Sequence, residues 1–164
     1  MARIRHASRK VSALSQTIRG YKGYSSSRSA RETDQVFSEE VLDKLSESLA
    51  IVARMKRSAV ESLNPEVSAI LERITDSADR LAQQVADTVP SQDALLASLE
   101  NGKAGEIEDL DSTILEKVGS INQALSMMDM EGGVGMTSED LDSVRELLDD
   151  LGNHLRRRSL LLAG

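Results

Sequence analysis

The residues with the clearest chemical potential are two tyrosines set among cations near the N-terminus. Tyr21 and Tyr24 are the only tyrosines in the chain. Aromatic rings stack on unpaired bases while neighbouring cations hold phosphates, and the same residue types suit a lipid surface with anionic head groups. Alternatively, the rings pin this segment against the rest of the protein. The segment is a candidate contact for a protein, nucleic-acid or lipid partner, and it consists of Arg19, Tyr21, Lys22, Tyr24, Arg28 and Arg31.

A second candidate surface is rich in methionine and lies around three clustered glycines. Methionine side chains are adaptable and can line a surface that accepts several protein partners. They also fill gaps in a core, and glycine commonly ends a helix, so core packing is the favoured interpretation. The candidate protein-contact residues are Met127, Met128, Met130 and Met136.

Several patterns resemble ligand sites but lack a defining feature. The stretch Gly132 to Thr137 resembles a phosphate loop, yet it lacks the Gly-Lys-Ser/Thr ending and a preceding strand. Four acids gather at a predicted helix start without the spacing of a calcium loop, and acids are favourable there for electrostatic reasons. They are Glu106, Glu108, Asp109 and Asp111.

Enzyme chemistry finds no support in the residue types. The chain has no cysteine, which excludes thiolate metal sites and cysteine nucleophiles. Its two histidines, His6 and His154, belong to no Glu-x-x-His or His-x-x-x-His pattern. The sequence therefore predicts no catalytic residue, no metal site and no cofactor.

The charges divide the chain into a basic arm and an acidic body. Residues 1–31 hold eight basic residues and no acid, whereas the other 133 residues hold 12 basic and 27 acidic groups. Nucleic acid or an anionic membrane would be repelled by that body. Such binding would need the arm, or the cluster Arg156 to Arg158.

The arm itself is predicted to be an amphipathic helix followed by a flexible link. Ile4, Ala7, Val11, Leu14 and Ile18 recur at steps of three and four, which places them on one helix face. Glycines and the run of serines at 25–27 then indicate a link. An arm rich in Arg and Ser without acids also fits an organelle transit peptide if the source is eukaryotic.

The remainder is predicted to be an all-α, elongated antiparallel helical bundle with coiled-coil-like packing. Aromatic residues make up only 2% of the chain, and aliphatic residues repeat at helical spacing in each long segment. Asn64-Pro65 and Pro90-Ser91 mark helix starts. No apolar run approaches the roughly 20 residues needed to span a bilayer. We expect an arm at 1–31, a bundle at 32–158 with helices at about 33–63, 66–89, 91–100, 107–130 and 138–158, and a tail at 159–164.

The tyrosine segment carries a resemblance to one group of proteins. Gly20-Tyr21-Lys22-Gly23-Tyr24, followed by Arg31-Glu32-Thr33-Asp34, resembles the start of small uncharacterised prokaryotic helical proteins. Their pattern is Gly-Tyr-x-Gly-Tyr, followed about six residues later by Arg-Arg-Glu-x-Asp, and Ala30 replaces the first of those arginines here. The resemblance implies no activity, but it implies that the tyrosine segment belongs to the mature protein.

These features predict a non-enzymatic, cytoplasmic protein that binds a protein partner or itself. In this hypothesis the bundle is a scaffold, and the basic arm is a second attachment point that raises the local concentration of the partner. Deleting residues 1–31 should then weaken binding and leave the helices intact. The alternative is direct binding of nucleic acid or an anionic membrane through the arm.

Overall fold

A computed structural model describes residues 2–130 and 137–163, with side chains from Arg9 onward. All regular structure in these residues is helical, which confirms the predicted all-α class. Within the described ranges, no helix is both long and apolar enough to cross a membrane. The helices are α1 (Ala2–Thr17), α2 (Ser27–Glu61), α3 (Pro65–Asp87), α4 (Gln92–Glu100), α5 (Ala104–Met130) and α6 (Ser138–Leu162).

Two helix ends differ from the prediction by four residues or more, and the other ends lie within three residues of it. Helix α2 begins at Ser27 because the Ser26 side chain accepts a hydrogen bond from the Ser29 amide, so the expected serine link is a helix cap. Helix α6 continues to Leu162, whose side chain is buried. The expected tail from residue 159 is therefore mostly helical. By contrast, Asn64 caps α3 and Pro65 occupies its first turn, as predicted.

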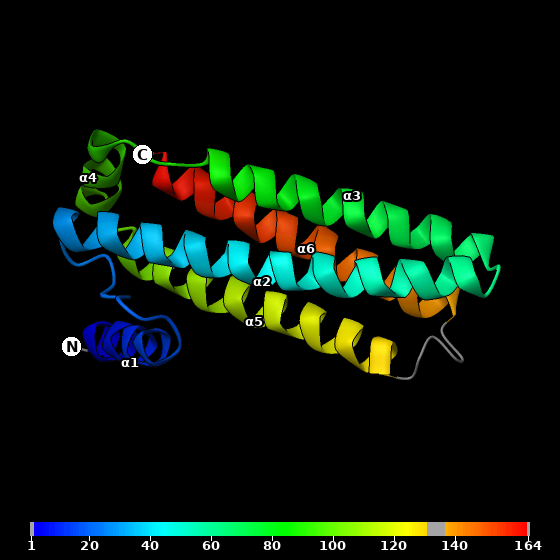
Figure 1. Cartoon of the computed structure of the whole chain (residues 1–164). Coiled ribbons are helices and arrows are strands. Elements are labelled where there is room, and N and C mark those ends of the chain that lie inside the picture. The colour runs from blue at the N-terminus through cyan, green and yellow to red at the C-terminus, as the bar shows by residue number, and fades with distance from the viewer. Residues whose placement is uncertain (1, 131–136, 164) are drawn as a thin grey trace.

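The four long helices lie side by side (Figure 1), and their direction depends on how the chain connects them. Helices α2 and α3 form one antiparallel hairpin, and α5 and α6 form another. Contacts also join α2 to α5 and α3 to α6, and each of these pairs runs in the same direction. Neighbouring long helices are thus antiparallel within each hairpin and parallel between the two hairpins. This follows because α4 and its flanking links lie at one end of the bundle, so α5 begins at the end where α3 finishes.

Aliphatic stripes of the long helices form the core, and the second half of the arm joins it. Residues such as Leu45, Ile74 and Ile114 are almost fully buried. Leu14 and Ile18 of the arm belong to the same buried cluster. The predicted division at residue 31 therefore does not coincide with a gap in the packing.

Candidate functional site

One end of the bundle brings both tyrosines into the interior. Tyr21 is 3% exposed and Tyr24 is 1% exposed. Their rings meet edge to face with centroids 6.4 Å apart. Neither ring is open to an unpaired base or a lipid surface in this structure, which corrects the stacking interpretation of the segment. The arrangement matches the alternative in which the rings pin the arm to the bundle.

Arg158 lies at the centre of the polar groups that surround these rings. Its Nη2 donates to the Tyr24 hydroxyl at 2.6 Å, and its Nε donates to Asp111 Oδ1 at 2.5 Å. The guanidinium also lies 4.3 Å from the centroid of the Phe37 ring, a cation–π distance. Asp111 accepts a second hydrogen bond, from the Tyr21 hydroxyl at 2.8 Å. Arg158 therefore ties the arm, α2, α5 and α6 together.

The burial of Arg158 corrects one prediction from the sequence. The sequence offers Arg156 to Arg158 as a basic cluster that could bind phosphates. Because α6 runs on to Leu162, the three arginines lie before its last turn, and Arg158 is only 5% exposed. Arg157 instead contacts Glu106 at 3.0 Å, so only Arg156 keeps an exposed side chain without an acidic partner among the described residues.

The cluster holds more carboxyl groups than cations. Asp34 Oδ1 lies 2.9 Å from Arg158 Nη2 but makes no hydrogen bond, because the geometry of that ion contact is poor. Glu108, also buried, accepts the Tyr24 amide at 3.0 Å. Two of these buried carboxyls, Asp34 and Asp111, contact the one guanidinium, whereas Glu108 contacts the backbone of Tyr24. We name the group formed by Tyr21, Tyr24, Asp34, Glu108, Asp111 and Arg158 the buried polar cluster.

Burial dominates the electrostatics of this cluster. Loss of water raises the pKa of Asp111 despite the opposing effect of Arg158. Burial also raises the pKa of Glu108. The pKa values of Tyr21 and Tyr24 are raised by burial and by the Asp111 charge, so both hydroxyls keep their protons. The Tyr21 hydroxyl therefore remains the donor to Asp111.

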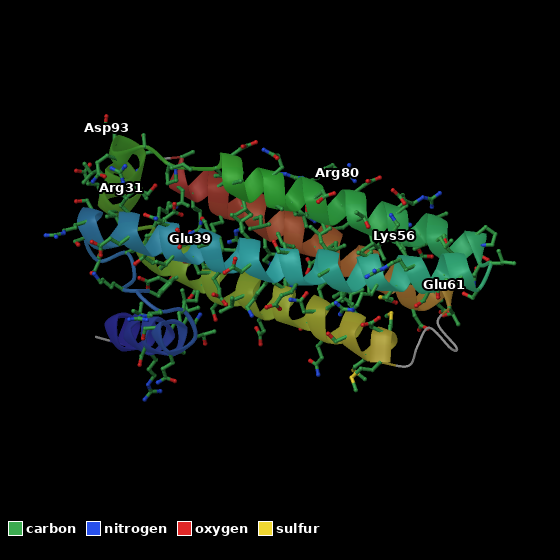
Figure 2. The ribbon with its side chains drawn as sticks, viewed as in Figure 1. Arg31, Glu39, Lys56, Glu61, Arg80 and Asp93 are labelled. Carbon is green, nitrogen blue, oxygen red and sulfur yellow. The ribbon has the colours of Figure 1, made fainter. Side chains whose placement is uncertain are left out.

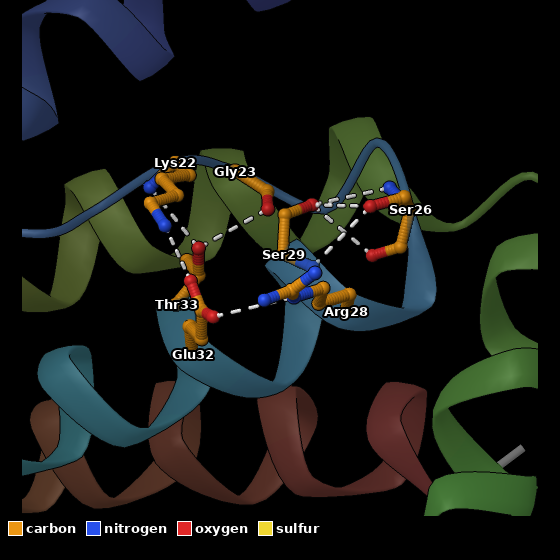
Figure 3. Close-up of polar contacts among 7 residues, drawn as sticks. All are labelled: Lys22, Gly23, Ser26, Arg28, Ser29, Glu32 and Thr33. Atoms are coloured by element: carbon orange, nitrogen blue, oxygen red, sulfur yellow. Dashed lines mark hydrogen bonds and ion pairs between the residues drawn. The ribbon is translucent and has the colours of Figure 1, made fainter.

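A glycine turn delivers the two tyrosines to the cluster. Thr33 Oγ1 accepts the Lys22 amide at 3.1 Å and donates to the Gly23 carbonyl at 3.1 Å, and Figure 3 shows this clamp beside the Ser26 cap. Gly23 has φ +81°, a left-handed conformation that favours glycine. A Cβ at Gly23 would lie 2.9 Å from Glu108 Oε1 and from a Val11 methyl group. The turn is thus restricted by both backbone and packing.

Replacing Gly23 by alanine is expected to lower the free energy of unfolding by about 2–4 kcal/mol, because backbone strain and overpacking add. Gly102→Ala is the matched control, since Gly102 also has positive φ but nothing lies within 4 Å of its added Cβ. It should cost only about 1 kcal/mol. Urea unfolding of both variants measures the difference. Equal losses would show that the fit of Gly23 against Glu108 and Val11 has no importance.

The cations of the candidate contact segment are only partly available. Lys22 Nζ lies 2.5 Å from a Glu32 carboxylate oxygen (Figure 3). This contact lowers the pKa of Glu32. Arg28 is 3.9 Å from Glu32 and is 92% exposed. Arg19 and Arg31 are exposed. The surface face of the segment is therefore basic but not aromatic.

The acids at the start of α5 pair with other elements. Glu106 contacts Arg157, and Asp109 pairs with Lys10 of the arm. Glu108 and Asp111 belong to the buried polar cluster. Among the side chains described, those of residues 9–130 and 137–163, no group of three His, Asp or Glu residues is placed to hold a metal ion.

The methionine surface is divided by the structure. Met127 is 58% exposed and Met130 is 86% exposed, whereas Met128 is partly buried against the core. Met136 lies outside the described residues. The interpretation of Met127 and Met130 as a protein contact stays a prediction.

The sequence does carry a signal for the buried polar cluster, namely charged residues at core positions of apolar helical stripes. Arg158 occurs at helical spacing between Leu155 and Leu162, which are core residues. Asp111 similarly falls between Ile107 and Ile114 on the buried stripe of α5. A charged residue on an apolar stripe is either misplaced or paired inside the protein, because an unpaired buried charge is costly. Asp34 of α2 follows the same rule, between Ala30 and Phe37.

A groove opens beside this cluster, along the link between α3 and α4. A cleft of about 290 Å³ and a second of about 480 Å³ share Val89 and Pro90 in their walls. Val89 is 78% exposed, and Leu160 in the second cleft is 70% exposed. Asp34 lies in the wall of the first cleft. We call these two adjacent clefts together the α3–α4 groove. Its lining residues include Arg31, Asp34, Glu39, Leu42, Val85, Ala86, Val89, Pro90, Leu95, Arg156, Leu160 and Leu162.

Comparisons with known proteins add no relative. No protein-family model matches the chain, and neither the curated proteins nor the solved structures contain a significant match. The resemblance of residues 20–34 to small prokaryotic helical proteins therefore stays a prediction. In the described residues, the buried polar cluster lies next to the α3–α4 groove, because Asp34 belongs to both.

Proposed function

We propose that this chain is a non-catalytic helical protein that binds a protein partner through the α3–α4 groove. The observation that carries the proposal is the exposure of Val89 and Leu160 on the walls of two adjacent clefts. Large apolar side chains gathered around a groove are typical of interaction sites. The groove also has charged residues of both signs at its rim, which suits a selective contact.

The elongated bundle, with coiled-coil-like packing, acts in this proposal as a scaffold for the groove. The buried polar cluster joins four elements at the same end, so it holds the groove walls in one arrangement. Arg158, Asp111 and the two tyrosine hydroxyls of the cluster hydrogen-bond one another in the interior, which favours a structural role over acid–base catalysis. We further propose a cytoplasmic site of action. The packing of Tyr21 and Tyr24 in the core argues that the arm belongs to the mature fold and is not a cleaved transit peptide.

The proposal is tested by placing a charge in the groove. Val89→Asp and Leu160→Asp should each lose at least about tenfold in affinity for the partner, because a carboxylate cannot be buried against an apolar surface. Partners would be captured from native extract after nuclease treatment, identified by mass spectrometry and titrated as purified proteins. Sedimentation equilibrium would reveal whether the partner is a second copy of this chain.

Matched controls lie at the opposite end of the bundle. Val60 and Leu63 are 63% and 87% exposed, and they lie around the turn between α2 and α3. Val60→Asp and Leu63→Asp should bind the partner as the unchanged protein does. If all four variants bind equally well, the groove is not the binding surface.

The second candidate function is attachment of the arm to nucleic acid or an anionic membrane. It is supported by the exposed side chains of Arg9, Arg19 and Arg31. With the tyrosines buried, this binding would depend on charge alone, so its affinity should fall steeply between low and moderate salt. The same cations could serve the main proposal as a weak second contact with the protein partner.

A further inference from the structure

The α3–α4 groove carries exposed apolar side chains beside its hollows. Val89 and Pro90 line both clefts, so they lie where the two clefts meet. The Val89 side chain is 78% exposed, and Leu160 in the wall of the larger cleft is 70% exposed. A face with both an apolar ridge and a hollow can pack against a copy of itself, because the ridge of each copy enters the hollow of the other.

The exposed charges in the walls of this groove are balanced in sign. Arg31 and Glu39 are exposed in the smaller cleft, and Figure 2 labels both on α2, near the α4 end. Asp87 and Arg156 are exposed in the larger cleft. A third acid in these walls, Asp34, is buried and belongs to the buried polar cluster. Two cations and two acids therefore remain for a partner.

Within the part of the chain that the structure describes, none of these four exposed charges forms an ion pair. Glu39 accepts a hydrogen bond from the Gln35 side chain at 3.1 Å, and Asp87 accepts two from the Gln83 side chain at 3.0 Å. An amide carries no charge, so these contacts leave both carboxylates uncompensated. A matching partner supplies one acid for each cation and one cation for each acid, and a second copy of the same face does this by symmetry.

We propose that the partner of the α3–α4 groove is a second copy of this chain, bound through the same groove about a two-fold axis. Val89 of each copy packs against the apolar wall around Leu160 of the other, and Arg156 of each copy pairs with Asp87 of the other. These two charges line the same cleft, so an axis through that cleft brings each to its opposite. A purely acidic or purely basic partner would compensate only half of the exposed charges. The inference rests on the proposed function, because it names the partner of the groove.

Sedimentation equilibrium of the full chain should show monomer and dimer in exchange at concentrations up to about 1 mM, where even a weak contact is populated. Val89→Asp should raise the dissociation constant of the dimer at least about tenfold, because a carboxylate loses water against an apolar wall. Leu63→Asp, at the opposite end of the bundle, should leave that constant unchanged. A monomer throughout this range would overturn the proposal. Equal weakening by Leu63→Asp would also overturn it, since the contact would then join opposite ends of two copies.

Exchanging the two charges of the larger cleft tests the two-fold arrangement. Arg156→Glu and Asp87→Lys should each raise the dissociation constant at least about tenfold, because each places like charges opposite each other twice in the dimer. Combined in one chain, they should restore the constant to within about threefold, since opposite charges face each other again. Arg57→Glu reverses an exposed arginine towards the other end of α2 and should change nothing. A combined variant that keeps its helical circular dichroism but stays monomeric would overturn the proposal.

The results separate this inference from the function proposed for the groove. If the chain stays monomeric but Val89→Asp loses a different protein captured from extract, the groove function stands and the two-copy contact fails. If a dimer forms that Val89→Asp, Arg156→Glu and Asp87→Lys all leave intact, the dimer uses another face and this inference fails. If Val89→Asp alters neither dimerisation nor capture, both proposals fail.

Discussion

Replacing Arg158 by methionine is expected to lower the free energy of unfolding by about 3–5 kcal/mol, the usual cost of removing one partner from a buried ion pair. The side chain is 5% exposed and contacts Asp34, Asp111 and the Tyr24 hydroxyl. Without it, the Asp111 carboxylate stays in the interior without a counter-charge. Urea unfolding at pH 7 measures the loss.

Arg157→Met is the matched control from the next position on the same helix. Arg157 is 63% exposed and contacts Glu106 at 3.0 Å, so it forms an ion pair at the surface. Such pairs contribute about 0–1 kcal/mol, and Arg157→Met should therefore unfold almost as the unchanged protein does. Equal losses for Arg157→Met and Arg158→Met would show that the buried polar cluster adds no particular stability.

A second variant tests the electrostatic explanation directly. Asp111→Asn keeps an oxygen that can accept the Tyr21 hydroxyl but removes the buried charge. Added to Arg158→Met, it should recover a large part of the lost stability, because the remaining amide is neutral. If the double variant is as unstable as the sum of the two single variants, the cost arises from lost packing of the arginine stem.

Deleting residues 1–24 is expected to destabilise the bundle by at least about 3 kcal/mol, since four large buried side chains are lost and each contributes about 1.5–3 kcal/mol before the cost of ordering the arm. Those side chains are Leu14, Ile18, Tyr21 and Tyr24, which are all less than 5% exposed. Asp111 also loses the Tyr21 hydroxyl, and Glu108 loses the Tyr24 amide. Thermal unfolding followed by circular dichroism measures the effect.

This expected result reverses the one drawn from the sequence, in which the arm could be removed with the helices intact. A control separates core packing from charge attraction. In Arg9→Gln with Arg19→Gln, the arm keeps its apolar residues and loses two exposed cations. It should melt at the temperature of the unchanged protein. If it melts as early as the deletion variant, the arm is held to the acidic body mainly by charge.

The sequence alone determined the helical class and most helix ends. The cause is local: aliphatic residues at helical spacing, Asn64-Pro65 at a helix start and glycine at helix ends act within a few residues of the chain. The early start of α2 at Ser27 was missed because serine suits a flexible link as well as a helix cap. The continuation of α6 was missed because Leu162 is a core residue only when other helices cover it.

Only the tertiary structure decided which polar residues belong to one site. Asp34, Asp111 and Arg158 come from three different helices, and nothing in their local sequence says that they meet. The helical spacing of Arg158 between Leu155 and Leu162 indicated a buried position, but its partners depend on how the two hairpins are joined. The two tyrosines also show that local sequence does not decide the role of a polar side chain. Aromatic rings among cations suit stacking on a ligand, yet an aromatic ring with a hydroxyl suits a buried hydrogen bond equally well. Only the packing of α5 and α6 around the rings selects the buried hydrogen bond.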